Sequence, residues 1–176
     1  MALDVVATSS ADPPASRPRI FGRDVEPTLL PWRWAAERLE AAELYWIATT
    51  RPDGTPHTRP VWGVWRDSRF SFTTESRAAR NLEQNPEITV HLESGAEVVI
   101  VEGLAEVARD VEALRATVEA YNAKYRDDVD PDAPSGWHVV RPRVVFGWIA
   151  EPTLRDGGAC FYGSVTKWTF TVSSPR

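Results

Sequence analysis

Short apolar runs separated by turn residues follow one another along the middle of the chain, and they constrain its fold more than any other feature. The first three runs occupy residues 44–50, 61–66 and 69–74. They are rich in β-branched and aromatic residues, which favour strands. Asp53-Gly54 and Asp67-Ser68 stand between them, and both pairs are typical of tight turns. The pattern therefore predicts consecutive antiparallel hairpins.

Further strands and three helices are predicted in the rest of the sequence. The strands occupy residues 88–92, 97–107, 143–149 and 165–172, and the helices residues 31–42, 76–85 and 111–125. Ser76 and Asp110 are suitable N-caps, and Gly103 is predicted to mark a bulge. The glycine-rich segment 156–163 is interpreted as a connection. This order predicts a mainly β, antiparallel fold, a small barrel with appended helices.

Composition bounds the domain organisation. Residues 1–24 are rich in Ala, Ser, Pro and Arg and predict a flexible leader, whereas residues 25–176 are predicted to form a single domain. The only cysteine, Cys160, excludes an intramolecular disulfide. Together with the lack of a secretion signal, it predicts a cytoplasmic protein.

Several classes of function are disfavoured by charge and by residue type. A net charge of −5 argues against binding to nucleic acid. No apolar run reaches the roughly 18 residues of a membrane span, so no membrane partner is expected. The three histidines, His57, His91 and His138, are scattered and form no metal-ligand pattern, so no metal site is predicted.

The junction between the third strand and the helix after it has the chemistry of a phosphate site. The strand ends in the hydroxyls of Thr73 and Thr74, and Ser76 follows as the N-cap. Arg77 and Arg80 lie three residues apart, so both cations project to one side of the helix. Backbone N–H groups at a helix start are unpaired and attract anions. The pattern favours a bound phosphate group.

A purely structural role for the same arginines is equally open from the residues alone. Glu75, Glu83 and Glu87 are close in sequence and would neutralise Arg77 and Arg80 by forming ion pairs with them. Arginines paired in this way would leave no net positive charge for a ligand.

The strand at residues 57–65 is expected to have an irregular backbone beside this junction. Alternation places Thr58, Pro60, Trp62 and Val64 on one face and the odd-numbered side chains on the other. Pro60 cannot donate to a neighbouring strand, so the backbone here is irregular or at an edge. Such a strand next to a phosphate site is a place where a flat ring could meet free backbone groups.

Seven motifs follow one another in order, with sensible spacing, between residues 28 and 172. They are Ala48-Thr49-Thr50-Arg51-Pro52-Asp53-Gly54, Pro60-Val61-Trp62-Gly63-Val64-Trp65, residues 76–86, Val98-Val99-Ile100-Val101-Glu102-Gly103, Tyr121-Asn122-Ala123-Lys124-Tyr125, Arg141-Pro142-Arg143-Val144-Val145-Phe146 and Thr166-Lys167-Trp168-Thr169-Phe170. As a set they resemble the pyridoxamine 5′-phosphate oxidase-like family, the split barrels that bind flavins or deazaflavins.

The resemblance implies a homodimer of FMN-binding split barrels, with FMN or the deazaflavin F420 in a groove between subunits. Residues that match the strand along the ring and tail are Arg59, Pro60, Val61 and Trp62. Residues that match the positions around the phosphate are Thr73, Thr74, Ser76, Arg77, Arg80 and Asn81. Lys167 and Trp168 match a C-terminal pair that approaches the pocket in relatives. Many relatives carry a phosphate-binding lysine at the position of Ala78.

The resemblance also implies an activity: an oxidoreductase that moves a hydride between F420 or FMN and a small organic substrate. The helix and the Pro-Val-Trp strand look closer to the deazaflavin branch, and no catalytic residue is assigned. Trp62 and Trp65 are expected to wall the site, and Tyr121, Tyr125 and Trp137 to line a substrate mouth, with core packing as the alternative for each. The alternative function is a protein that binds flavin, haem or tetrapyrrole in the same groove without turnover.

Overall fold

The turn signals of the sequence divide the chain into short strands with helices between them. The computed structural model describes residues 11–19, 26–153, 155–156 and 158–171, which contain nine strands and four helices. The strands are β1 (Ala15–Ser16), β2 (Tyr45–Thr50), β3 (Pro56–Val61), β4 (Gly63–Arg66), β5 (Arg69–Thr73), β6 (Glu87–His91), β7 (Glu97–Val107), β8 (Trp137–Ile149) and β9 (Thr166–Thr169). The helices are α1 (Trp32–Ala41), α2 (Arg77–Gln84), α3 (Val111–Tyr125) and α4 (Ala159–Ser164).

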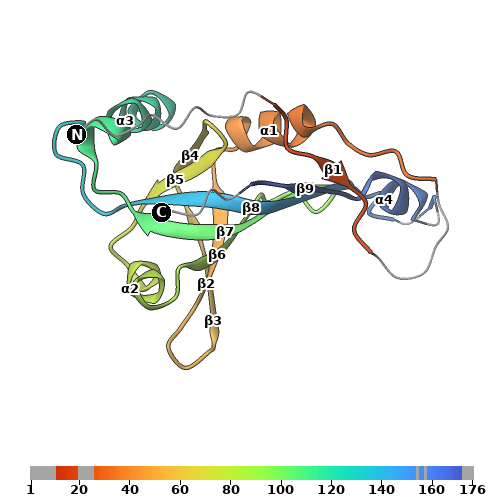
Figure 1. The fold of residues 1–176 in the computed structure, drawn as a ribbon, viewed down its shortest axis with the longest axis horizontal. Helices are drawn as coiled ribbons and strands as arrows, with labels where there is room; N and C mark the ends of the chain where they lie inside the picture. The colour runs from red at the N-terminus through yellow and green to blue at the C-terminus, as the bar shows by residue number, and fades with distance from the viewer. Residues whose placement is uncertain (1–10, 20–25, 154, 157, 172–176) are drawn as a thin grey trace.

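The nine described strands form one antiparallel sheet, as the hairpin pattern predicts. Its order is β1-β9-β8-β7-β6-β2-β3, and β5, which pairs with β4, also joins it at β8. One residue, Trp62, separates β3 from β4, so these strands are two parts of one bent stretch of chain. In Figure 1 the β2–β3 hairpin extends below the rest of the sheet, with α1 and α3 above the sheet and α2 beneath it. The predicted mainly β, antiparallel architecture is confirmed.

Two apolar clusters hold the helices against the sheet. The main core receives Trp32, Ala35 and Leu39 from α1 and Ala78 and Leu82 from α2, against alternate side chains of the strands. A second cluster joins α3 to β4 and β8, with residues that include Val64, Leu114, Val118, Tyr121 and Trp137. Burial of apolar area is the main stabilising term in both clusters. The sheet is thereby covered by α3 close to the break between β3 and β4.

Gly103 lies at an irregularity of the β7–β8 pair, as predicted. Glu102 pairs with Val144 and Gly103 with Pro142, so Arg143 is the extra residue. A Cβ on Gly103 would lie 2.3 Å from the carbonyl oxygen of Arg141. Only glycine lets the two backbones approach this closely, and Pro142 has no N–H to contribute to the ladder. The bulge therefore requires glycine at position 103, and it accommodates Pro142.

The break at Trp62 differs from the single strand predicted for this stretch. Trp62 is 61% exposed, whereas Val64 is buried, so the two side chains do not share a face. Gly63 sits at the break because an added Cβ would lie 2.4 Å from the Phe70 ring. The alternation expected from the sequence is interrupted there.

Two other segments also differ from the predictions. β8 begins at Trp137 rather than at residue 143, and α4 forms within the segment interpreted as a connection. Asp156 stabilises the start of α4, since its carboxylate accepts from the N–H groups of Gly158 and Cys160. Within the predicted leader, β1 pairs with β9, and residues 1–10 and 20–24 lie outside the described residues.

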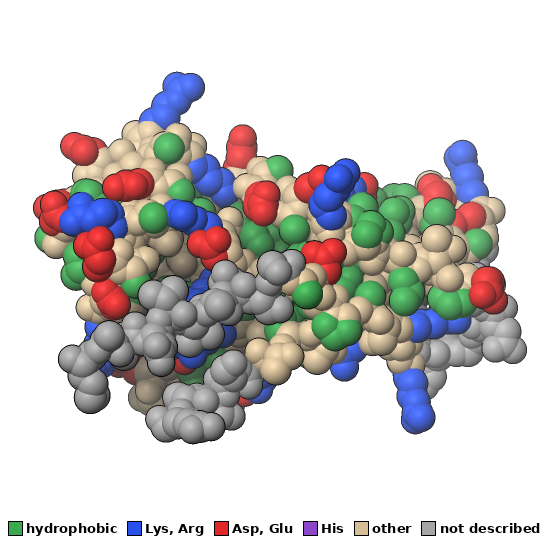
Figure 2. Space-filling model, turned by 45° about the horizontal axis from the view of Figure 1, so that its top comes forward, with side chains coloured by type: hydrophobic (Ala, Val, Ile, Leu, Met, Phe, Trp, Pro, Cys, Tyr) green, Lys and Arg blue, Asp and Glu red, His purple; other side chains and the backbone are tan. Residues whose placement is uncertain are grey.

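Charges of both signs are mixed on the surface. Figure 2 shows acidic and basic side chains interspersed, most densely over the end of the molecule that carries α3. This mixing agrees with a total of 25 acidic and 20 basic residues. Among the described helices, none has the length and apolar character needed to cross a membrane.

His138 makes folding stability sensitive to acid. It is buried in β8, stacked on Phe72 with ring centroids 5.4 Å apart, and its Nδ1 lies 3.1 Å from the carbonyl oxygen of Gly136. Burial lowers its pKa, while the bond to Gly136 and the charge of Glu83 oppose this shift. The unfolded chain therefore binds a proton at His138 more readily than the folded chain does.

We expect the contribution of His138 to the free energy of unfolding to be complete above the ordinary histidine pKa of about 6.5. As the pH decreases below this value, the free energy of unfolding should decrease by at most about 1.4 kcal/mol per pH unit for one group. Urea unfolding between pH 7.5 and 5 measures this slope. The variant His138→Phe keeps the stacking and removes the titration, so its slope should be smaller. A slope identical to that of the unmodified protein would show that His138 is not the group responsible.

Candidate functional site

Seven of the predicted cofactor-contact residues line one cavity of about 730 Å³. They are Arg59, Pro60, Val61, Trp62, Thr73, Thr74 and Ser76. Leu44, Glu75 and Tyr121 also line it. The volume lies within the roughly 300–1,000 Å³ range of small-molecule sites. The end of β3, the end of β5 and the start of α2 thus meet at one cavity, although they are separate in sequence.

The hydroxyl groups of the cavity are organised by the turn between β5 and α2. Thr74 Oγ1 lies 2.8 Å from Ser76 Oγ and accepts from the backbone N–H of Ser76 at 3.3 Å. Ser76 Oγ accepts from the N–H of Ala78 at 3.2 Å, which confirms Ser76 as the N-cap. The start of a helix carries partial positive charge. The turn therefore brings two hydroxyls and a positive helix end to the same wall.

Arginines from three elements add positive charge beside this wall. Burial lowers the pKa of His57 in β3, and the charges of Arg51, Arg77 and Arg59 lower it further. Arg51 follows β2, Arg59 lies in β3 and Arg77 begins α2, so their fields converge at His57. The Nε atom of Arg59 is buried and has no hydrogen-bond partner among the described residues. A negatively charged ligand would satisfy these groups.

The ion pairs distinguish the two interpretations of the arginines. Among the described residues, no carboxylate forms an ion pair with Arg77 or Arg80, nor with Arg51 or Arg59. Glu87, one of the expected partners, pairs with Arg143 instead. Ion pairing of Arg77 and Arg80 with neighbouring acids, the alternative interpretation, is therefore not seen in the described part of the chain. The cavity fits a phosphate-bearing ligand at its Ser76 end.

The last turn of α3 fixes the break between β3 and β4. The Tyr125 hydroxyl accepts from the N–H of Gly63 at 3.1 Å and lies 2.8 Å from the carbonyl oxygens of both Gly63 and Glu43. Lys124 Nζ donates to the Gly63 carbonyl at 3.1 Å, and burial lowers the pKa of Lys124 to about 8. Because Gly63 follows Trp62 directly, these bonds position the exposed Trp62 ring at the cavity.

The variant Tyr125→Phe should loosen this attachment. It leaves the buried N–H of Gly63 without its acceptor, which costs about 1–3 kcal/mol. We expect a loss of that size in the free energy of unfolding, measured in urea. Tyr121→Phe is the matched control one turn earlier, since no hydrogen bond of its hydroxyl is seen within the described residues. Equal losses in the two variants would contradict a specific role for the Tyr125 hydroxyl.

Three predicted phosphate residues lie on α2 outside the lining of the cavity. Arg77 and Arg80 are exposed, and Arg77 is close enough to shift the pKa of His57. Asn81 is buried and donates from Nδ2 to Thr49 Oγ1 at 2.9 Å, which holds α2 against β2. Ala78 is fully buried in the core, so α2 offers no cation at that position.

The C-terminal pair is not brought to the cavity within one chain. Lys167 and Trp168 lie in β9, which pairs with the far half of β8. Trp168 is fully buried, and its ring packs edge-on to Trp32 with centroids 5.6 Å apart. Lys167 is half-buried and points to the opposite face of the sheet, since neighbouring strand residues alternate. Their contact with a cofactor stays a prediction.

The aromatic residues divide between the cavity and the core. Trp62 and Tyr121 line the cavity, and the Tyr125 ring lies 6.5 Å from that of Trp62. Trp65 and Trp137 are buried, at 5% and 1% exposure, so the expected wall and mouth positions are wrong for these two. Core packing, the alternative weighed for them, is what the structure shows.

Sequence reasoning missed Leu44, Glu75 and Lys124 as residues of the site. Leu44 is exposed although it is large and apolar, but this is visible only once β2 is placed. Glu75 entered the sequence analysis only as a counter-charge, yet it lines the cavity. Lys124 belongs to a recognised motif, whereas its bonds to Gly63 and Tyr45 depend on the packing of α3.

Comparison with known proteins places this fold among relatives. The family pattern described as pyridoxamine 5′-phosphate oxidase matches residues 34–150, well over half of the chain. No protein of curated function matches the sequence.

Three solved structures illustrate the likeness. A conserved hypothetical protein from Mycobacterium tuberculosis is 26% identical, with a TM-score of 0.55, over 65% of this chain and 81% of its own. An FAD-binding protein from Mesorhizobium loti is 17% identical, with a TM-score of 0.53, over 78% and 94%. An F420 reductase is 28% identical, with a TM-score of 0.48, over 62% and 94%. The extent of the family match, together with this antiparallel fold, shows that the chain belongs to the pyridoxamine 5′-phosphate oxidase family.

Proposed function

We propose that this protein is an oxidoreductase that transfers a hydride between a bound FMN or F420 and a small organic substrate. The observation that carries the proposal is the cavity beside α2, whose lining brings Arg59 and the hydroxyls of Thr74 and Ser76 together with the exposed Trp62 ring. Membership of the family supports a flavin-type cofactor. The seven predicted contact residues that share the cavity support its position.

Different residues in and beside the cavity would contact different parts of the cofactor. Arg59 and Arg77, with the hydroxyls of Thr74 and Ser76, would hold the phosphate, because all four lie at or beside the start of α2. Pro60, Val61 and Trp62 would lie along the ring. When bound, the cofactor supplies the hydride chemistry, so no dedicated acid–base pair is required. Leu44 and Tyr121 would exclude water from one side of the bound ring.

The homodimer belongs to the same proposal. Aligned pairs across the strands place Trp46, His91, Ile100, Phe146 and Lys167 in one row on one face of the sheet. These side chains are only half-buried, although three of them are large and apolar. Exposed apolar patches commonly mark protein interfaces. A dimer packed through this row would place Lys167 at the subunit boundary, where the family groove lies.

The variant Ile100→Glu tests this interface, because it places a charge in the middle of the row. We expect a dimer for the unmodified protein and a monomer for the variant in analytical ultracentrifugation. Glu93→Lys, which changes an exposed charge in the turn after β6, serves as a control and should remain dimeric. A variant Ile100→Glu that still forms the dimer would place the interface elsewhere.

Titration with FMN and with F420 side by side tests the cofactor. The motif likeness favours F420, so we expect a change in F420 fluorescence on binding and weaker binding of FMN. The pKa of His57, followed by NMR, should rise on binding, since a phosphate would offset the charges of Arg51, Arg59 and Arg77. If neither cofactor binds at high micromolar concentration, the proposed enzyme is wrong.

A binding protein without turnover is the second candidate. It is favoured by Ala78, whose burial leaves α2 without the cation that many relatives carry. A lost charge-assisted hydrogen bond costs about 1.5–3 kcal/mol, so the affinity must come from the remaining arginines. Binding of a cofactor without any oxidation of the reduced form by small organic acceptors would favour this second function.

A further inference from the structure

A row of three arginines crosses the sheet on the side of α3, away from the cofactor cavity. Arg66 of β4 stands opposite Arg69 of β5. On the other side of β5, the β5–β8 pairing ends at Phe70 and Val140, so Arg69 and Arg141 each lie one residue beyond it, and both line the same cavity. Directly opposite side chains have Cβ atoms about 5 Å apart, and like charges at that distance are destabilising. The row therefore needs negative charge close by.

Two of the three arginines have a carboxylate, and the middle one has none. Arg66 Nε lies 3.2 Å from Asp67 Oδ2, and Arg141 Nη2 lies 2.7 Å from Glu106 Oε2. Arg69 forms no ion pair with a described carboxylate. One positive charge in the centre of the row is thus left uncompensated.

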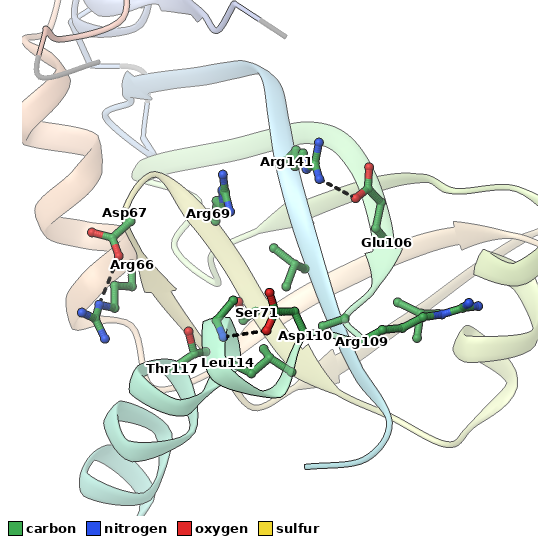
Figure 3. Close-up of a pocket in the computed structure, with 14 residues that line it drawn as sticks. Arg66, Asp67, Arg69, Ser71, Glu106, Arg109, Asp110, Leu114, Thr117 and Arg141 are labelled. Carbon is green, nitrogen blue, oxygen red and sulfur yellow. Dashed lines mark hydrogen bonds and ion pairs between the residues drawn. The ribbon is translucent and has the colours of Figure 1, made fainter. Parts of the chain in front are cut away.

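A cavity of about 270 Å³ opens beside Arg69. Its lining includes all three arginines of the row and the first turn of α3, as Figure 3 shows. Ser71 lies in its wall, two residues after Arg69 and therefore on the same face of β5. Ser71 is 5% exposed, but its hydroxyl oxygen is not sealed off by the protein. None of the hydrogen bonds seen among the described residues involves this hydroxyl, so it faces the cavity. A hydroxyl that faces a cavity without a protein partner is free to donate to a ligand there.

The carboxylates of the cavity limit the size of what can bind. Asp67 and Glu106 are engaged with Arg66 and Arg141, and Asp110 caps α3 by accepting from the N–H of Ala113 at 3.1 Å. Three acids around four arginines, Arg109 included, would repel an extended polyanion. A single small anion at Arg69 is compatible with them.

We propose that this cleft binds a small oxyanion of the phosphate class, held by Arg69 and by the hydroxyl of Ser71. Arg69 supplies the charge, and Ser71 Oγ donates to one oxygen of the anion. The site is separate from the cofactor cavity and shares no lining residue with it. A free phosphate and the phosphate group of a larger metabolite would use the same contacts.

Titration of the full chain with inorganic phosphate, followed by amide and arginine Nε–H NMR signals at constant ionic strength, tests the proposal. We expect saturable shifts at Ser71 and Arg69, a loss of affinity of at least tenfold in Arg69→Gln, and a several-fold loss in Ser71→Ala. Arg33→Gln is the control, since Arg33 is exposed on α1 and pairs with Glu37. Glycerol phosphate in place of inorganic phosphate shows whether a larger phosphate ester is accepted.

The design separates this site from the cofactor site. A variant without Arg59 and Arg77 should keep the phosphate response at Ser71, whatever becomes of cofactor binding. Two results would overturn the proposal: shifts confined to residues 76–79, or an affinity that Arg69→Gln leaves unchanged while its urea midpoint matches that of the control. Shifts at Ser71 that chloride reproduces equally would also overturn it, as they would mark an adventitious ion only.

Discussion

Replacing Arg59 and Arg77 together with alanine should weaken cofactor binding by at least a hundredfold. Each arginine is expected to donate a charge-assisted hydrogen bond to the phosphate, worth about 1.5–3 kcal/mol, and the two come from different elements that meet at one cavity. Fluorescence titration with F420, and with FMN in parallel, measures the loss. Because neither side chain belongs to the buried core, the urea midpoint should change little.

Two further variants sharpen this result. Arg33→Ala removes an exposed arginine of α1 that pairs with Glu37, and it should leave the affinity unchanged. Glu75→Gln removes a negative charge from the cavity lining, so it should tighten binding several-fold. An affinity that Arg59→Ala and Arg77→Ala leave intact, with both variants folded, would place the phosphate elsewhere.

The second large effect is expected at the bulge between β7 and β8. Gly103→Ala would bring a Cβ to 2.3 Å from the Arg141 carbonyl, a backbone atom that cannot turn aside as a side chain can. We expect a loss of about 3 kcal/mol or more in the free energy of unfolding, measured by urea denaturation. If the variant does not accumulate in folded form, the same prediction is met in its strongest form.

Gly95→Ala provides the matched comparison in the same region of the chain. Gly95 lies in the turn before β7, and an added Cβ there would meet nothing within 4 Å. Its effect should stay within about 0.5 kcal/mol. Equal stability of the two variants would mean that the strands move apart at the bulge at little cost.

Local signals in the sequence were sufficient where a residue's role is local. Ser76 caps α2 and Asp110 caps α3 through bonds to backbone groups two or three residues away. Gly103 was predicted as a bulge because glycine in a strand interior has few other roles. The site residues of β3, β5 and α2 were recognised through family motifs, and most of them share one cavity.

The errors arose where tertiary packing overrides the local pattern. The sequence predicts a strand only from residue 143, yet β8 begins at Trp137 and runs through Pro142, which sits at the bulge, where its missing N–H is not needed. Trp65 was expected to form a wall of the cofactor site, but the break at Gly63 directs its side chain into the core, where it packs against Trp32. α4 forms in a glycine-rich segment because Asp156 binds its first N–H groups. The contacts of Pro142 and Trp65 join residues far apart in the sequence, whereas Asp156 lies only two and four residues before its partners, so this last signal was local and was missed.

The break at Trp62 couples ligand binding to the stability of the folded chain. One stretch of chain lines the cavity through β3 and then enters the core through β4, so the sheet cannot open there without dismantling the site. A ligand that binds only the folded chain adds about 2.7 kcal/mol to the free energy of unfolding at a concentration of one hundred times its dissociation constant. The supply of cofactor in the cell would then set how much of this protein escapes proteolysis, and its abundance would follow the cofactor pool.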